Sequence, residues 1–179
     1  MIEKLKEILE NLPQLLMDND VHTMYIDYHK PFVSRIWFQH EDYRVFIHKI
    51  EPCNDSAEAL YHPHKWDSAM LICSGSYEMG IGHSKTKKAP KETDCKLILP
   101  KGTFYEMTAK DGWHYVNPID DACYTIMITG KLNGRQMPIE PKKEFRTLSQ
   151  EEVLNILSQI PQLETIDKVI LTKQIISHE

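Results

Sequence analysis

The stretch from residue 32 to residue 129 constrains the fold of this 179-residue chain more than any other feature. Short runs rich in Val, Ile, Tyr, Phe and Thr alternate there with Gly, Pro, Asn or charged clusters, a pattern typical of strands and turns. No helical pattern of ten residues interrupts them, which favours antiparallel pairing into a sandwich or barrel over a parallel sheet. Strands are expected near residues 32–38, 43–51, 59–64, 66–73, 77–83, 96–99, 103–108, 113–117 and 122–129.

Helical patterns flank this region on both sides. Residues 2–17 place Ile and Leu at three-and-four spacing, which predicts an amphipathic helix that Pro13 should end or kink. Ser149 and Glu152 have the spacing of a capping box, and Pro161 closes the helix that follows. The last stretch is amphipathic but β-branched, and we expect it to be helical too. The expected divisions are an N-terminal helix (1–20), a barrel (30–140) and a C-terminal helical extension (147–179).

Charge and composition exclude several classes of partner. The 26 acidic residues outnumber the 21 Lys and Arg residues, which argues against nucleic acids and anionic membranes as partners. No segment approaches the ~18 apolar residues of a membrane span, and the N-terminus lacks the pattern of a secretion signal, so we expect a cytoplasmic protein. A chain of this length buries a full core without metal or disulfide staples. A metal ion here would therefore be functional, and Cys73 and Cys123, which lie in apolar runs, are expected to be buried thiols.

The histidines suggest a metal site. Residues i and i+2 of a strand point to the same face, so His62 and His64 offer two imidazoles toward one point. His114, 50 residues after His64, is the candidate for a third ligand, although it could equally be an ordinary half-buried strand residue. Imidazole suits Fe, Zn, Cu, Ni and Mn, so the pair alone does not choose the metal. His48 alternates into a strand, and we expect it to have a surface or core role rather than to bind metal.

The two histidine segments resemble the two motifs of the cupin superfamily. In the first motif, approximately G-x5-H-x-H-x3,4-E-x6-G, the two histidines and Gly75 fall in register. In the second, approximately G-x5-P-x-G-x2-H-x3-N, His114 matches, while Gly102, Gly112 and Asn117 each lie one place out of register. The resemblance covers roughly residues 32–130. It implies an all-β, cupin-type double-stranded β-helix (jelly-roll) barrel, here with an N-terminal helix and a C-terminal helical segment.

The chain departs from the cupin pattern at the family's carboxylate ligand. Ser68 stands where the motif has Glu, and strand alternation aims the neighbouring Asp67 at the opposite face unless a bulge shifts it. The simplest site is then three neutral imidazoles, from His62, His64 and His114. Such a site keeps the full charge of a dication, which favours anionic ligands.

A three-histidine cupin is similar to the thiol dioxygenases, such as cysteine dioxygenase. The resemblance implies that Arg35, which lies on an early strand ahead of the H-x-H pair, binds a substrate carboxylate; the alternative is an ordinary surface ion pair. The His and Tyr that end the last strand in that family fall near Met127 and Thr129 here. The family's Cys crosslinked to Tyr has no clear equivalent.

Strand alternation predicts the lining of a pocket. If His62 and His64 face inward, then Trp66, Ser68 and Met70 share that face. The opposite wall comes either from Tyr105 and Met107 or from the alternating residues Phe104 and Glu106, and the sequence does not choose between them. A barrel of this size must also fill its interior with such side chains, so the pattern does not require a ligand.

Three functional hypotheses follow. The first is a metal-dependent enzyme, a non-haem iron dioxygenase acting on a small anionic thiol or carboxylate, with Fe(II) favoured and Zn, Ni or Mn as alternatives. In it Arg35 orients the substrate, and Trp66 with Tyr105 shapes the pocket. The second is a non-catalytic barrel that binds a metal or a metabolite, and the third is a barrel with an empty site. The expected partners are a small-molecule substrate and a second copy of the chain in a homodimer.

Overall fold

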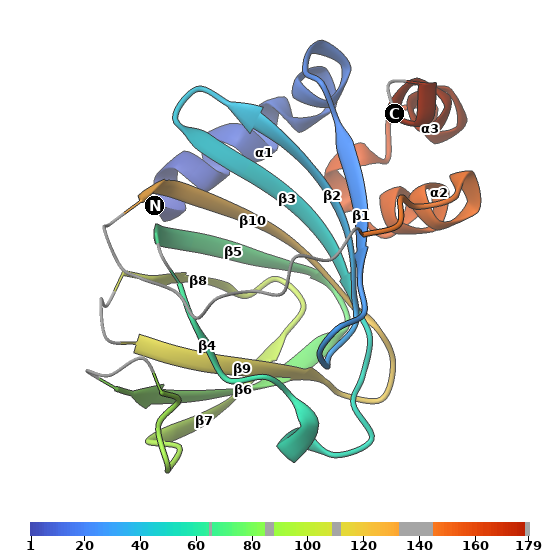
Figure 1. Ribbon diagram of the computed structural model, residues 1–179. Coiled ribbons are helices and arrows are strands. Elements are labelled where there is room, and N and C mark those ends of the chain that lie inside the picture. The colour runs from blue at the N-terminus through green and yellow to red at the C-terminus, as the bar shows by residue number, and fades with distance from the viewer. Residues whose placement is uncertain (65, 85–87, 109–111, 133–144, 178–179) are drawn as a thin grey trace.

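Two antiparallel sheets face each other in the computed structural model (Figure 1), which describes residues 1–64, 66–84, 88–108, 112–132 and 145–177. The larger sheet has the strand order β1-β2-β3-β10-β5-β8, and the smaller one has the order β4-β9-β6-β7. The strands are β1 (His22–Ile26), β2 (Val33–His40), β3 (Tyr43–Ile50), β4 (His62–Pro63), β5 (Trp66–Ser74), β6 (Ser76–His83), β7 (Cys95–Pro100), β8 (Phe104–Met107), β9 (Gly112–Pro118) and β10 (Cys123–Leu132).

The order of the strands defines a jelly-roll barrel. From β3 to β10 the chain crosses between the two sheets at every step except the β6–β7 hairpin, so that β3, β10, β5 and β8 are neighbours in one sheet and β4, β9, β6 and β7 in the other. This is the double Greek key of an eight-stranded jelly roll. The strands β1 and β2 extend the larger sheet beyond it. The predicted all-β fold class is confirmed.

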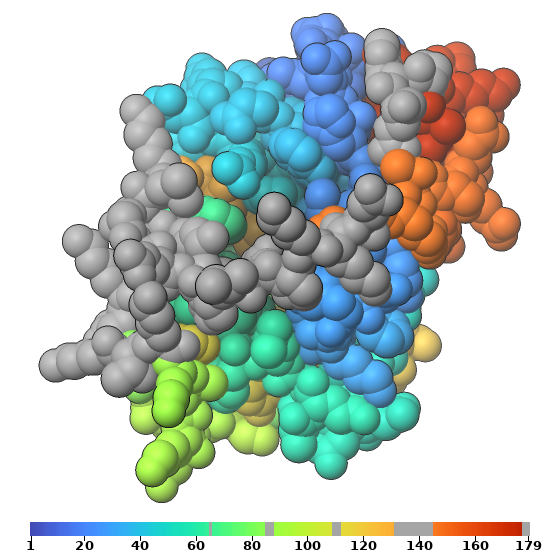
Figure 2. Space-filling view, in the orientation of Figure 1, coloured from blue at the N-terminus to red at the C-terminus, as the bar shows by residue number. Residues whose placement is uncertain are grey.

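Helices cover the larger sheet from outside. They are α1 (Ile2–Asp18), α2 (Gln150–Ser158) and α3 (Lys168–Ser177), with short 3-10 turns at Ser56–Glu58 and Pro161–Leu163. The space-filling view shows the two C-terminal helices, in orange and red, beside the blue N-terminal segment (Figure 2). The predicted capping box of α2 is formed, because Ser149 Oγ accepts from the Glu152 backbone and the Glu152 carboxylate accepts from the Ser149 backbone. None of the described helices is long and apolar enough to cross a membrane.

Alternation along the strands divides the apolar residues into two cores. The outer core lies between the larger sheet and the helices; Leu12, Phe38 and Ile156 are among its fully buried members. The inner core lies between the sheets and includes Met70 and Met127. Because the outer core supplies much of the buried apolar area, the inner face of the larger sheet can carry polar side chains without loss of the fold.

The structure corrects several sequence predictions about elements. Of the two outcomes predicted for Pro13, an end or a kink of the first helix, the end is wrong, since the helix runs on to Asp18 and the packing of its buried Leu face outweighs one lost hydrogen bond. The strand β1 was not predicted. The strand expected at residues 59–64 is reduced to His62–Pro63, after a 3-10 turn. The expected end of the barrel at residue 140 lies outside the described residues, whereas the expected start of the C-terminal extension at residue 147 lies within them, shortly before α2.

Candidate metal centre

Three imidazoles meet inside the barrel. His62 on β4 lies directly opposite His114 on β9 in the smaller sheet, and His64 follows two residues after His62. The His114 Nε2 atom lies 3.1 Å from His62 Nε2 and 3.0 Å from His64 Nε2. Among the described residues, these three side chains form the group of potential metal ligands, with all their ligand atoms within 4.8 Å, and Asp67 is not part of it. The prediction that the distant His114 joins the pair is confirmed as geometry.

The opposite nitrogen of each ring has its own partner. His62 Nδ1 lies 3.1 Å from the Leu60 carbonyl oxygen, His64 Nδ1 lies 2.9 Å from Ser68 Oγ, and His114 Nδ1 lies 3.5 Å from Met79 Sδ. Outward Nδ1 contacts of this kind orient the imidazoles of metal sites and fix their tautomers. The three rings are therefore held with their Nε2 atoms toward one another.

These partners determine where the ring protons lie. A carbonyl oxygen and a thioether sulfur only accept hydrogen bonds, so the Nδ1 atoms of His62 and His114 carry the protons. In the neutral rings both Nε2 atoms then present lone pairs, and two lone pairs 3.1 Å apart cannot share a hydrogen bond. A cation between the rings would satisfy both. The donor set thus fits a metal ion better than it fits a purely structural histidine cluster.

The spacing of the nitrogens also fits an ion with further ligand positions. Two nitrogens bound to one ion at about 2.1 Å lie about 3.0 Å apart at a right angle and about 3.4 Å apart at the tetrahedral angle. The observed separations of 3.1 and 3.0 Å are of the size expected for nitrogens that share one ion. Three protein ligands then leave positions for other molecules, as in non-haem iron sites.

Burial keeps the imidazoles of His62 and His114 neutral. Loss of solvent lowers the pKa of His62 to about 4, and the positive charge of Arg35 contributes to this shift. Loss of solvent, with the neighbouring His62 and His64, also lowers the pKa of His114. Metal ions bind neutral imidazole, so protons compete weakly for the site at neutral pH.

The lowered pKa values predict an acid-sensitive metal-free protein. Below the ordinary pKa of 6.5, the unfolded chain protonates His48, His62 and His114 while the folded chain keeps them neutral. The free energy of unfolding should therefore decrease as the pH is lowered below 6.5, by up to about 1.4 kcal/mol per pH unit for each group. For His62 this loss should continue down to about pH 4. Urea denaturation of the metal-free protein between pH 7.5 and 4.5 measures this slope. His62→Asn should reduce the slope, and a pH-independent stability would contradict the prediction.

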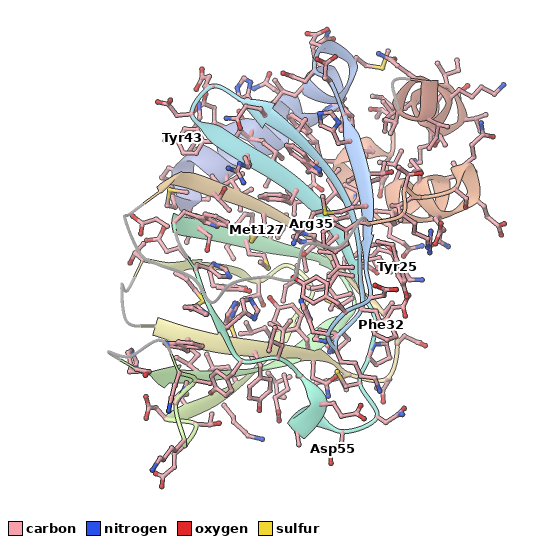
Figure 3. All side chains as sticks on the ribbon, in the orientation of Figure 1. Tyr25, Phe32, Arg35, Tyr43, Asp55 and Met127 are labelled. Atoms are coloured by element: carbon pink, nitrogen blue, oxygen red, sulfur yellow. The ribbon has the colours of Figure 1, made fainter. Side chains whose placement is uncertain are left out.

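The inner face of the larger sheet carries polar side chains next to the cluster. Arg35 on β2, with the guanidinium 4.9 Å from the centre of the Phe46 ring, points between the sheets, as does Met127 (Figure 3). Its Nε donates to Nε2 of His48, 3.0 Å away, and Nδ1 of His48 lies 3.3 Å from Thr125 Oγ1. Arg35 is therefore half-buried, with its guanidinium directed between the sheets.

The predicted pocket residues lie on the same inner face. Ser68 is 3 % exposed and touches His64, and Met70 belongs to the inner core. The guanidinium of Arg44, on the inner face of β3, lies 5.6 Å from the centre of the Trp66 ring. Arg35 is half-buried and brings positive charge to the inner surface, whereas Arg44 is exposed to solvent.

The structure resolves the alternative left open on β8. Tyr105 faces the inner core, whereas Phe104 is 37 % exposed and Glu106 pairs with the N-terminal amine outside the barrel. The Tyr105 hydroxyl contacts the Tyr77 hydroxyl and donates to Met70 Sδ at 3.0 Å. Burial raises the pKa of the Tyr105 hydroxyl well above its usual range, so it stays protonated.

Sequence reasoning missed several residues on the inner faces of the two sheets. Met79 reads as an ordinary strand residue, and only the pairing of β6 with β9 places it against His114. His48 was expected to have a surface or core role, and nothing near it in sequence indicates its link to Arg35. A signal did exist for Arg44, which shares the alternation of Phe46 and His48 along β3.

Comparisons with known proteins show no close relative. No protein-family model matches the sequence, and no curated protein sequence matches it. Among solved structures, the hydroxypropylphosphonic acid epoxidase from S. wedmorenis superposes with a TM-score of 0.48 and 10% identity, over 60% of this chain and 55% of that chain. A structure of Fe(II) HppE gives a TM-score of 0.48 and 12% identity, over 63% of this chain and 56% of that chain. The chain thus spans little more than half the length of these proteins, and similarity at this level assigns it no function.

Proposed function

We propose that this chain is a metal-dependent cupin enzyme in which His62, His64 and His114 hold a divalent ion, with Fe(II) favoured. The observation that carries the proposal is the convergence of three Nε2 atoms whose rings are oriented by outward Nδ1 contacts. A bound divalent ion would supply Lewis acidity and, if it is iron, the ability to activate dioxygen. Zn, Ni and Mn remain the alternatives.

We further propose a small anion, a thiol or a carboxylate, as the substrate. Three neutral imidazoles leave the charge of a dication uncompensated, and the charge of Arg35 reaches the same region, where it lowers the pKa of His62. A guanidinium binds a carboxylate through paired, charge-assisted hydrogen bonds. In the described strands, no inner position of the larger sheet carries a carboxylate that would repel such a ligand.

Other side chains shape the space around the ligand. The inner core, with Phe46, Met70 and Met127, excludes water from the base of the site and strengthens charge interactions there. Trp66 and Tyr105 would form the walls, with the Tyr105 hydroxyl as a protonated donor at the base. Homodimerisation and a cytoplasmic location remain predictions.

Metal analysis and oxygen uptake test the proposal together. The purified protein, reconstituted anaerobically with Fe(II), Co(II) or Zn(II), should bind one equivalent per chain. The Fe(II) form should then consume oxygen when given small thiols or carboxylates such as cysteine, 3-mercaptopropionate and mercaptoacetate. One equivalent of metal without oxygen uptake would support the alternative, a binding module without turnover. Failure to bind any of the three ions would disprove the metal site.

Ser68 should be needed for tight metal binding although it is not a ligand. Its Oγ contacts Nδ1 of His64, and loss of such a partner typically lowers metal affinity about 10–100-fold. We expect Ser68→Ala to weaken Co(II) binding by this factor in a competition titration with a chelator. Ser34→Ala is the matched control, because Ser34 is equally buried but lies on the outer face of β2. Equal effects of both substitutions would contradict the orienting contact.

A further inference from the structure

A polar row crosses the inner face of the larger sheet and is not used by the metal ligands. Arg35 on β2 lies directly opposite His48 on β3, and His48 lies directly opposite Thr125 on β10. His48 is 4 % exposed and Thr125 is completely buried. An apolar side chain would fill this place at lower cost in desolvation, so three polar residues in register require another reason.

The hydrogen bonds of this row have a single direction. The guanidinium has no acceptor, so Arg35 Nε donates and His48 Nε2 must hold a lone pair. The proton of the neutral ring is then on Nδ1, which donates to Thr125 Oγ1. Burial and the charge of Arg35 both lower the pKa of His48, in agreement with a neutral ring.

The same contacts fix the plane of the guanidinium. His48 holds it at one edge through Nε, while the face of Phe46 lies 4.9 Å from its central carbon. The His48 ring is itself stacked on Phe46, with 5.7 Å between centroids and 14° between planes. A long, flexible side chain is thus ordered before any ligand arrives, which reduces the entropy lost on binding.

We propose that His48 is a positioning residue that orients the Arg35 guanidinium to receive the anionic group of a ligand held at the three-histidine cluster. The inference rests on the proposed function, because it takes that cluster as the second anchor of the same ligand. Such a ligand carries two groups, one that binds the metal and one carboxylate or comparable anion that binds Arg35. His48 itself touches neither the ligand nor the metal.

Two thiols of the same length separate positioning from general stability. Mercaptoacetate carries a thiolate and a carboxylate, whereas 2-mercaptoethanol has a hydroxyl in place of the carboxylate. Absorption titrations of the Co(II)-loaded protein measure the dissociation constant of each thiol without turnover. His48→Leu should weaken mercaptoacetate about tenfold and leave 2-mercaptoethanol unchanged, because only the first uses Arg35. Arg35→Leu should reduce mercaptoacetate to the level of 2-mercaptoethanol.

Two further variants make the result specific. His48→Gln offers a side-chain carbonyl that can accept from Arg35 Nε, so it should restore most of the affinity for mercaptoacetate. His83→Leu, at an exposed histidine on β6, should change neither affinity. Equal weakening of both thiols by His48→Leu would reveal a merely structural residue and overturn the proposal. So would no change for either thiol.

The ring nitrogens of His48 provide a test that needs no metal. Nitrogen NMR of the metal-free protein, with the His48 signals assigned by their loss in His48→Gln, should show a proton on Nδ1 and none on Nε2. A proton on Nε2 would exclude the hydrogen bond from Arg35 and overturn the proposal. If the protein bound no Co(II), the proposed metal function would fail while this spectrum would still decide whether His48 holds Arg35.

Discussion

Replacing His114 by alanine should abolish metal binding while leaving the barrel folded. His114 Nε2 lies 3.1 and 3.0 Å from the Nε2 atoms of His62 and His64, so its loss leaves two ligands from one short segment. The loss of metal affinity should be larger than that expected for an orienting partner such as Ser68, which is about 10–100-fold. Chelator competition with Co(II), together with metal analysis of the purified variant, measures the change.

The matched control for His114→Ala is His83→Ala. Both histidines belong to the smaller sheet, but His83 is an exposed residue whose Nδ1 lies 2.8 Å from an Asp94 carboxylate oxygen. The His83→Ala variant should bind the same amount of metal as the unmodified protein. His62→Ala and His64→Ala should behave like His114→Ala. An unchanged metal content across these three variants would contradict the shared site.

Replacing Phe38 by alanine should cost about 3–5 kcal/mol of unfolding free energy, the typical cost of removing a fully buried aromatic ring. Phe38 on β2 has no exposed surface and packs in the outer core against the helices. The cavity would open in the outer core, on the side of the larger sheet opposite the histidines. The midpoint of urea denaturation measures the loss.

Phe104→Ala provides the comparison. Because Phe104 is 37 % exposed, this substitution should lower the free energy of unfolding far less than Phe38→Ala. The folded fraction of Phe38→Ala should bind Co(II) with unchanged affinity, since the outer and inner cores are separate clusters. Saturating metal should also raise the stability of both variants, by about 2.7 kcal/mol at 100 times the dissociation constant. A parallel loss of metal affinity in Phe38→Ala would show that the two cores are coupled.

The barrel and the His62–His64 pair could be predicted because their signals are local, whereas the distant His114 was a candidate supported by the resemblance to the cupin motifs. Strand alternation places His62 and His64 on one side, and the capping box at Ser149 marks the start of α2. The short strand β1 was not predictable in this way. Its residues His22–Ile26 lack a clear alternation, and they form a strand because β2 supplies their hydrogen bonds.

The surroundings of the site depend on strand register, which the sequence does not contain. Met79 meets His114, and His48 meets both Arg35 and Thr125, only after strands distant in sequence have paired. The choice between Tyr105 and Phe104 likewise required the pairing of β8 with β5. Residue types therefore identified the potential metal ligands, whereas the side chains that contact His114, Arg35 and Tyr105 could be found only from the structure.

The strict alternation of β3 restricts the insertions and deletions that evolution can accept there. His48 faces the interior and Ile47 faces the helices, so deletion of one residue within the strand would exchange their environments. The deletion would place the imidazole of His48 in the apolar outer core. It would also remove the hydrogen-bond acceptor of Arg35. Length changes should instead accumulate in the hairpin at Glu41 and Asp42, where the chain already turns with a positive φ at Glu41. Variation among descendants of this gene should therefore consist of point substitutions inside the barrel strands and of length changes at their tips.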